Sequence, residues 1–349
     1  MSKTPPPSQE AIAPPLPAMR PPARHAMLEF LSRAGEIWTL AILLLIMALF
    51  GVLAPEFFSQ ANWLATSQYA VEYVLLGLAE TVVIITGGID LSVGAILGFS
   101  AMVGAVVMRA LINDQLATSI VLPLGIVAAL ASGTFAGWLN GQAITRLRLT
   151  PFVVTLGMLS MGTGGLYLLN NGSNIDTIPD IIGTLGSLTL AGWLPVTVLI
   201  TAVFCILVGL LLAQTRFGLR NYAIGSNPLG ASRAGIDVPR HLVKVYMLSG
   251  FLSAVAGLMV MARFASASIQ AGANDELDAI TAVVIGGASL FGGRGTVLGT
   301  VIGAFVITVM VTGLILTGVQ PFWQQVAVGA ILIFAVALDQ LRDKLLDSF

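Results

Sequence analysis

The chain has 349 residues, of which 56% are hydrophobic and only 9% are charged, with a formal net charge of −1. A mean hydropathy of +0.93, carried by repeated apolar runs of about 20 residues that can each cross a bilayer, excludes a soluble domain. The near-zero net charge predicts no nucleic-acid partner. Because lipid offers no hydrogen bonds to an exposed backbone, we expect an all-α fold, a polytopic transmembrane helical bundle.

Neither a metal nor a cofactor is expected. Cys205 is the only cysteine, which excludes an internal disulfide, and it lies in an apolar run where a thiol packs as a small hydrophobe. His25 and His241 lie far apart in the sequence, so no cluster of Cys and His predicts a metal site.

The first 36 residues differ in composition from the rest of the chain. Prolines are frequent between Pro5 and Pro22, and no apolar run begins before residue 37. Residues 1–36 are therefore predicted to form a disordered cytoplasmic tail, and they do not resemble a cleaved secretory signal. A transmembrane domain over residues 37–338 follows, and residues 339–349 are expected to form a cytoplasmic C-terminal tail.

Ten membrane spans are predicted from the apolar runs. They cover residues 37–53, 69–86, 93–111, 118–139, 152–169, 193–213, 243–262, 279–291, 297–317 and 322–338. The number could differ by one or two, because the run at 279–291 is too short to cross the bilayer unaided.

The basic residues predict which span ends face the cytoplasm, since Lys and Arg concentrate in cytoplasmic loops. With the N-terminus inside, 14 of the 16 Lys and Arg residues fall on the cytoplasmic side, and only Arg109 and Arg263 fall outside. The C-terminus is then cytoplasmic too. Tryptophan gives a second check, because indole prefers the membrane interface and all five tryptophans lie at or near predicted span ends: Trp38, Trp63, Trp138, Trp193 and Trp323.

Two glycine pairs about 200 residues apart suggest an internal duplication. An even number of spans separates them, so a duplication would be parallel in sense, although small residues are also common wherever membrane helices pack closely. Paired glycines can break a helix inside the protein, and such breaks often line a permeation route. The residues assigned to helix breaks and close packing are Gly87, Gly88, Gly94, Gly98, Gly286, Gly287, Gly299 and Gly303.

Polar residues within or beside the spans are candidates for the translocation pathway. Glu80 is the clearest, since a central carboxylate costs roughly 2.5–3.5 kcal/mol to insert and must face protein or water. The alternative is a structural role for Glu80, protonated or bonded to a neighbouring helix. An amide lining would suit a neutral, hydroxyl-rich solute, although adjacent asparagines commonly cap loops. The candidates are Glu80, Asp90, Asn140, Thr155, Asn170 and Asn171.

The segment 214–244 is a polar, basic loop between hydrophobic runs. Asn227 followed by Pro228 is typical of a helix start, and Gly235 is typical of a helix end. A helix of about seven residues is too short to persist alone in water, so it needs a surface to dock on. It is either a connector lying on its own membrane domain or a coupling helix that inserts into a motor subunit.

At these residues the chain resembles a known family, the inner-membrane permeases of bacterial ATP-binding-cassette (ABC) importers for ribose and related sugars. The resemblance covers the chain from about residue 72 to the C-terminus, without the proline-rich N-terminal segment. Its motifs are the segments 87–94 (GGIDLSVG), 140–141 (NG), 150–157 (TPFVVTLG), 217–218 (FG), 223–227 (AIGSN), 234–236 (AGI), 286–287 (GG) and 291–295 (FGGRG).

The resemblance implies a multi-pass protein of the bacterial inner membrane with defined partners. Two permease chains would form the pathway, a cytoplasmic ABC ATPase would dock on the loop, and a periplasmic sugar-binding protein would deliver the solute. The permease itself would be no enzyme, and the segment 287–294 lacks the lysine of a phosphate-binding loop. The residues assigned to ATPase coupling are Gly225, Asn227, Pro228, Ala231, Ala234, Gly235 and Ile236.

The function expected from the sequence is import of a monosaccharide or sugar-like solute by alternating access. The competing hypothesis is a proton-coupled secondary transporter of a small polar solute, with Glu80 as the carrier. Proton relays usually recruit several buried ionisable groups, and here Glu80 is nearly alone in its span. A membrane enzyme is a third class, but the sequence offers no nucleophile–base pair or metal-ligand spacing to support it. No residue chooses among the sugars of the family.

Overall fold

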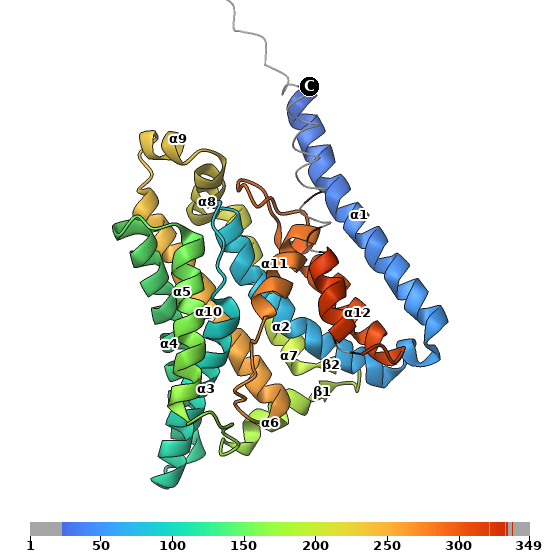
Figure 1. The fold of residues 1–349 in the computed structure, drawn as a ribbon, viewed down its shortest axis with the longest axis vertical. Coiled ribbons are helices and arrows are strands. Elements are labelled where there is room, and N and C mark those ends of the chain that lie inside the picture. Colours follow the sequence, from blue (N-terminus) through green and yellow to red (C-terminus); the bar gives the residue numbers. More distant parts are fainter. Residues whose placement is uncertain (1–22, 321, 332, 334–336, 338–349) are drawn as a thin grey trace, which may run out of the picture.

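The computed structural model describes residues 23–320, 322–331, 333 and 337, and this part of the chain is a helical bundle (Figure 1). The long helices are α1 (Ala23–Leu53), α2 (Gln60–Ile84), α3 (Val93–Asn113), α4 (Thr118–Arg146), α5 (Pro151–Leu169), α7 (Val196–Gln214), α10 (Val238–Phe264) and α12 (Val297–Leu316). The short ones are η1 (Pro55–Phe58), α6 (Asp180–Ser187), α8 (Arg216–Ser226), α9 (Pro228–Arg233) and α11 (Asp275–Ile285). Residues 322–331 are also helical.

Within the described residues, seven helices are long and apolar enough to cross a bilayer: α1, α3, α4, α5, α7, α10 and α12. The polytopic helical bundle expected from the sequence is therefore confirmed at this level. Helix α2 is long enough but too polar for this set, because Glu72 and Glu80 lie within it. Its polarity fits its position, since its residues from Ala70 to Ile84 are almost all buried inside the protein.

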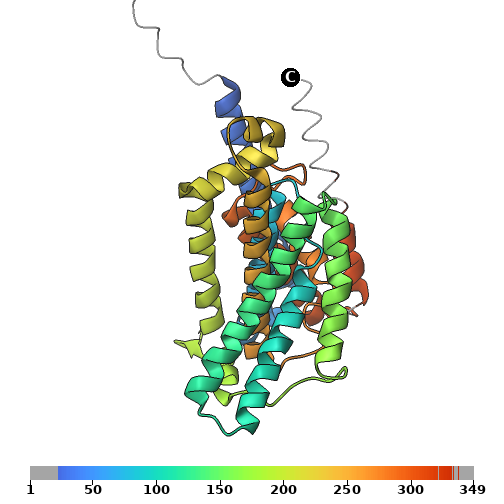
Figure 2. The same cartoon turned by 90° about the vertical axis from the view of Figure 1, so that its left-hand side faces the viewer.

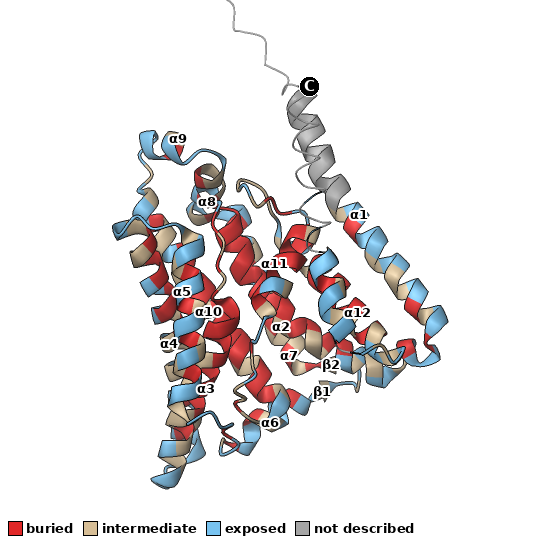
Figure 3. Ribbon diagram, in the orientation of Figure 1, coloured by how far each residue is buried: buried red, intermediate tan, exposed pale blue. Residues whose placement is uncertain are grey.

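Helices α2 and α10 form the centre of the bundle. Helix α10 packs along α4, α2 and α3, whereas α1 packs on α12 at the edge. Figure 3 shows the contrast between the buried central helices and the largely exposed α1. Where α4 meets α10, a Cβ on Gly137 would lie only 2.1 Å from the Tyr246 carbonyl oxygen. The backbones of these two helices therefore approach each other as closely as glycine allows.

Several boundaries differ from those predicted. Helix α1 begins at Ala23, so residues 23–36 of the predicted tail are helical; no proline follows Pro22 there, and helix-forming residues predominate. Residues 1–22 and 339–349 of the predicted tails lie outside the described residues. Before α7, the chain also forms α6 and a small antiparallel ribbon, β1 (Thr189–Leu190) and β2 (Leu194–Pro195), which the all-α prediction missed.

Helix α11 has only 11 residues and covers about 16 Å, half of a hydrocarbon core. The chain reaches it from α10 through the non-helical segment 265–274, which packs on α3. Non-helical backbone at this depth is tolerated where it is buried in protein, as at Ala267 and Gly272, or lines a cavity, as at Ala273 and Asn274. The short span predicted at 279–291 is therefore a half-helix preceded by a segment that consists mostly of turns.

Helices α2 and α11 end in the same way. The Gly88 amide donates to the Val83 carbonyl, and the Ala288 amide donates to the Val283 carbonyl, so each helix closes with a six-residue turn. Gly87 and Gly287 occupy the left-handed position of this turn, with φ angles of +81° and +92°. After each turn the chain leaves the helix and returns to the bundle.

The bundle has two different ends. Helices α8 and α9 lie at one end, and α6 with the β1–β2 ribbon lies at the other (Figure 1). Figure 2 shows α8 lying across the end of the bundle, where α7 stops. Helices α2 and α11 both run from the ribbon end towards the α8 end.

Candidate functional site

The structure of the α8–α9 segment agrees in part with the prediction from the loop sequence. The Asn227 side chain caps α9 by accepting a hydrogen bond from the Gly230 amide at 2.8 Å, and Pro228 is the first helical residue. Gly235 follows the helix with a φ angle of +85°, so the predicted start and end are confirmed. Helix α8 is an additional element that the predicted loop lacked.

The other residues assigned to coupling lie around the end of α9. Ala231 is buried and accepts a hydrogen bond from the Ile236 amide at 3.1 Å, which closes the last turn. Ala234 and Gly235 are exposed, and Ile236 is half-buried. A side chain at Gly235 would meet no atom within 4 Å. This surface therefore faces away from the bundle.

Helix α8 is bonded to the end of α2. The Asn221 amide donates to the Val82 carbonyl at 2.9 Å, and Nε2 of His241 on α10 lies 2.7 Å from the Asn221 oxygen. Both side chains are buried. At Gly225 the approach is closer still, because an added Cβ would lie 1.8 Å from the Ile85 carbonyl oxygen.

The same helix contacts the segment that follows α11. The Tyr222 hydroxyl donates to the Gly295 carbonyl at 2.8 Å, and a Cβ on Gly225 would lie 2.5 Å from the Gly293 nitrogen. The Gly293 amide in turn donates to the Ile85 carbonyl at 2.8 Å. Helix α8 thus meets the end of α2 and the segment that follows α11 at one place, where these two parts of the chain are also bonded to each other.

Four of the six candidate pathway residues lie near the turn between α2 and α3. Asp90 accepts hydrogen bonds from the hydroxyls of Ser92 and Ser249, and Asn140 donates to Ser92 at 2.8 Å. Glu80 is fully buried near Asp90, and neither of its carboxyl oxygens has a geometric hydrogen-bond partner. These side chains form a buried polar cluster.

Thr155 lies at the edge of this cluster, whereas Asn170 and Asn171 lie elsewhere. The Thr155 hydroxyl is 3.0 Å from the Pro151 carbonyl of its own helix and 3.4 Å from the Ile89 carbonyl. Asn170 accepts from Arg109 at 2.7 Å and donates to two carbonyls of its own loop. Asn171 is an exposed residue with a φ angle of +49°.

The glycines assigned to close packing hold α11 and the segment before it. A Cβ on Gly94 or Gly98 of α3 would lie 2.3 or 2.4 Å from backbone oxygens of the segment 271–272. On α12, a Cβ on Gly299 would lie 2.0 Å from the Gly286 oxygen, and one on Gly303 would lie 1.9 Å from the Ala282 oxygen. The half-helix is therefore enclosed by backbone-to-backbone contacts.

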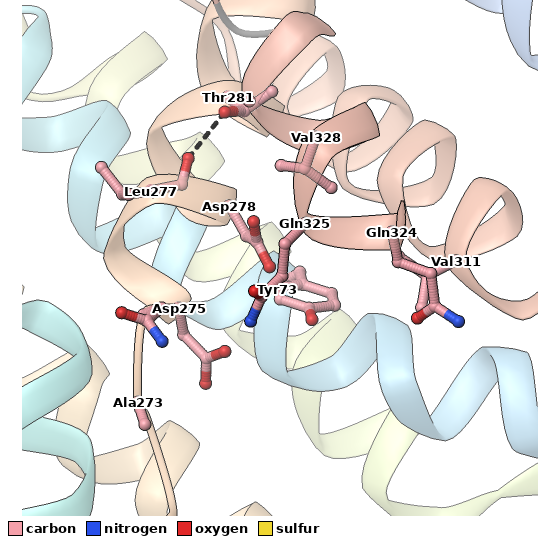
Figure 4. A pocket seen from close by; sticks show the side chains of 12 residues that line it. Tyr73, Ala273, Asp275, Leu277, Asp278, Thr281, Val311, Gln324, Gln325 and Val328 are labelled. Carbon is pink, nitrogen blue, oxygen red and sulfur yellow. Dashed lines mark hydrogen bonds between the residues drawn. The ribbon is translucent and has the colours of Figure 1, made fainter. Parts of the chain in front are cut away.

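Two polar cavities open on the side of the bundle where α11 begins. None of the sequence motifs predicts them. The first has a volume of about 460 Å³ and is lined by residues of α2, α11, α12 and residues 324–329 (Figure 4). The second has a volume of about 420 Å³ and lies between α2 and the segment 264–275. Tyr73 and Asp275 line both cavities. The sequence signal that could have indicated these cavities is the group of acidic residues before the apolar run of α11: Asp275, Glu276 and Asp278.

The described part of the chain, with seven helices long and apolar enough to cross a bilayer, defines a polytopic membrane protein. Its sequence matches the family described as "branched-chain amino acid transport system / permease component" over residues 62–336, and the chain belongs to that family. Its relatives include the fructose import permease of Rhizobium meliloti, which is 36% identical over 89% of this chain and 87% of the relative.

Two other relatives cover similar shares of the chain. The ribose import permease of Bacillus subtilis is 36% identical over 89% of this chain and 94% of the relative. The galactose/methyl galactoside import permease of Escherichia coli is 35% identical over 90% of this chain and 96% of the relative. The chain is thus similar over most of its length to permeases with different sugars in their names.

Proposed function

We propose that this chain is the membrane-spanning permease subunit of an ABC importer that moves a monosaccharide or a similar neutral solute into the cell. The family match and the three sugar import permeases support this function. The observation that carries the mechanism is the contact of α8 with the end of α2 and with the segment 293–295 that follows α11. A force applied to α8 would reach the end of α2 directly and would reach α11 through that segment.

The partners follow from this proposal. A separate cytoplasmic ATPase docks on α8 and α9, so the permease itself catalyses no reaction. A periplasmic sugar-binding protein delivers the solute to the opposite end, and a second permease chain completes the pathway in the bacterial inner membrane. The N-terminus, the C-terminus and the loop 214–244 then face the cytoplasm, in line with the distribution of basic residues.

The mechanism is alternating access. When ATP binding closes the motor domains, the docked segment moves, and α8 displaces the end of α2 together with the segment that follows α11. The backbone contacts at Gly299 and Gly303 allow α11 to shift along α12 without opening large voids. The buried cluster around Asp90 and Asn140 keeps the α2–α3 turn attached to α4 and α10 during this movement.

The candidate pathway residues remain part of the proposal in different roles. Glu80, Asp90, Asn140 and Thr155 lie around the moving turn, so a change in their packing accompanies each cycle. Asn170 and Asn171 lie in the loop that follows α5, near the delivery end. There Asn170 donates hydrogen bonds to carbonyls of its own loop and not to the buried polar cluster.

The experiment replaces Gly225 in the transporter reconstituted with its ATPase and binding protein. Gly225→Val has no room against the Ile85 carbonyl, so ATP hydrolysis stimulated by the sugar-loaded binding protein should fall at least about 10-fold. Tyr222→Phe removes only the bond to Gly295 and should lower the same rate by a smaller factor. Gly235→Val, strained by its positive φ, should lower it as well.

The matched control is Gly209→Val on α7, where an added side chain meets no atom within 4 Å. All four variants should reach the membrane in amounts similar to the unchanged protein. Normal stimulated hydrolysis in both Gly225→Val and Tyr222→Phe would contradict the coupling assignment.

A further inference from the structure

The two cavities that share Tyr73 and Asp275 have the size of a small-molecule site. Their volumes of about 460 and 420 Å³ fall within the range of about 300–1,000 Å³ that ligand pockets occupy. Tyr73 is nine-tenths buried and lies on α2 between them. Figure 4 shows Tyr73, Asp278 and Gln325 grouped on the wall of the first cavity.

The lining is rich in groups that bind hydroxyls. Asp275 and Asp278 offer carboxylate acceptors, and Asn274, Gln324 and Gln325 offer amides that both donate and accept. The second cavity adds the amides of Asn174 and Gln270 and the phenol of Tyr69. Aromatic rings and short apolar side chains of both cavities supply surface for the C–H face of a sugar ring.

The charge of the lining excludes one class of solute. Among the described residues that line either cavity, the charged ones are acidic, namely Glu72, Asp275 and Asp278, and none is Lys, Arg or His. An anionic solute such as a sugar phosphate or a sugar acid would meet these acidic groups, whereas the nearby basic group, Arg263, lies outside both linings, over the Tyr69 ring at 3.7 Å and beside Glu72. A neutral solute with many hydroxyls meets complementary donors and acceptors instead.

One wall of this site lies on α2, which is bonded to α8, and the other lies on α11, whose following segment is bonded to α8. Tyr73 lies on α2, whose last turn is bonded to Asn221 of α8. Asp275 and Asp278 lie in the first turn of α11, whose C-terminal turn leads to the Gly293 contact with Ile85. A displacement of α8 therefore moves the two walls that carry the principal polar groups.

We infer that the two adjacent cavities around Tyr73, Asp275 and Asp278 bind the transported solute, and that they accept uncharged sugars but reject phosphorylated and acidic ones. This inference rests on the proposed function and adds the site and its charge selectivity. The solute is held between α2 and α11 until the movement of α8 separates or closes these walls.

The test measures uptake and ATP hydrolysis side by side in proteoliposomes that contain the complete transporter. The probes are radiolabelled D-ribose, D-fructose and D-galactose, with D-ribose 5-phosphate and D-glucuronate as the charged counterparts. Asp278→Leu, Tyr73→Leu and Gln325→Leu should each lower uptake of the accepted sugar about 10-fold, since each removes polar contacts to it. ATP hydrolysis stimulated by the binding protein should stay within two-fold.

The matched controls are Asp180→Asn and Tyr167→Phe, two exposed positions outside both cavities. They should leave uptake and hydrolysis unchanged, and a Tyr73→Phe variant should retain more uptake than Tyr73→Leu because it keeps the ring. Uptake within two-fold of the unchanged transporter in all three cavity variants would overturn the site. Efficient uptake of either charged probe would overturn the charge selectivity.

The outcome also separates this inference from the proposed function. If the unchanged transporter takes up no neutral sugar, sugar import itself fails, and the site falls with it. If it takes up a neutral sugar and the cavity variants do so equally well, sugar import stands and only the site is wrong.

Discussion

At the scale of single residues, Asn227 and Gly225 act on opposite faces of the α8–α9 segment. Asn227 stabilises α9 from within by capping its first turn, and its side chain lies on an exposed surface. Gly225 faces the bundle, where the Ile85 carbonyl leaves no space for a side chain. Asn227 therefore affects the surface offered to a partner, whereas Gly225 affects the contact with the end of α2.

Replacing the cap should weaken docking of the ATPase. Asn227→Ala removes the acceptor for the Gly230 amide and should destabilise α9 by about 1 kcal/mol, which corresponds to a five- to ten-fold higher Kd for the ATPase. Asn227→Ser should stay within two-fold because serine also caps helices. The measurement is a titration of the purified permease in detergent.

The control for this prediction is another helix cap at the far end of the molecule. Ser59 caps α2 by accepting from the Asn62 amide, so Ser59→Ala should cost similar helix stability without changing ATPase affinity. Equal effects of Asn227→Ala and Ser59→Ala on the Kd would show that the cap acts through overall stability only.

At the scale of elements, the half-helix α11 depends on two kinds of glycine. Gly287 is required for its backbone conformation, with a φ angle of +92° and open space around it. Gly303 on α12 is required for its size, because a Cβ there would lie 1.9 Å from the Ala282 carbonyl oxygen. The two positions should respond differently to the same substitution.

Alanine at these positions separates backbone strain from helix separation. Gly287→Ala should cost about 1 kcal/mol and lower Tm by about 2–4 °C, whereas Gly303→Ala should lower it two to three times as much because α11 and α12 must move apart. Gly157→Ala on α5, which meets no atom within 4 Å, should leave Tm unchanged or raise it slightly. Thermal unfolding in detergent measures all three.

An unchanged Tm in the Gly303→Ala variant would mean that the helices are not held by this contact. The measurement does not depend on transport, so it examines the packing of α11 directly.

The sequence predicts some of these elements well and others poorly, for physical reasons. The spans corresponding to α3, α5 and α12 follow from apolar runs bounded by polar residues, and the start and end of α9 follow from Asn227, Pro228 and Gly235. Helix α2 begins at Gln60, earlier than predicted, because its first turns are polar and contact protein. Hydropathy cannot detect helical turns that are this polar.

The candidate sites show the same division. The Gly-Gly turns are visible in the sequence because a left-handed turn needs glycine, and the α9 cap is visible because its residue types are specific. The cavity around Tyr73 depends on residues that are about 200 positions apart and on the unexpected path of the segment 265–274. No local pattern brings Tyr73, Asp278 and Gln325 together.

At the scale of the whole molecule, the two ends have different surfaces. The end with α8 and α9 carries Arg216, Arg220, Arg233 and Arg240, whereas the cavities near the start of α11 are lined by acidic and amide side chains. The positive-inside rule assigns the first end to the cytoplasm, and the cavities then lie towards the outside.

Cysteine labelling can establish this orientation in intact cells. With Cys205→Ala as the background, a membrane-impermeant maleimide added from outside should label Asn274→Cys and should not label Leu229→Cys on α9. Both native side chains are exposed, so burial does not account for a difference. Permeabilising the membrane should make Leu229→Cys reactive, and labelling of that variant before permeabilisation would reverse the orientation.

Helix α8 contacts its neighbours through their main-chain oxygens. The oxygens of Val82 and Gly295 accept its hydrogen bonds, and the oxygen of Ile85 lies against Gly225. Carbonyl groups are the same whatever side chain they carry. Substitutions in the middle of α2 and the first turn of α11 that alter which solute is recognised can therefore accumulate without any compensating change at the contacts of α8. Permeases that transport different solutes can in this way keep the same coupling contact with their ATPase.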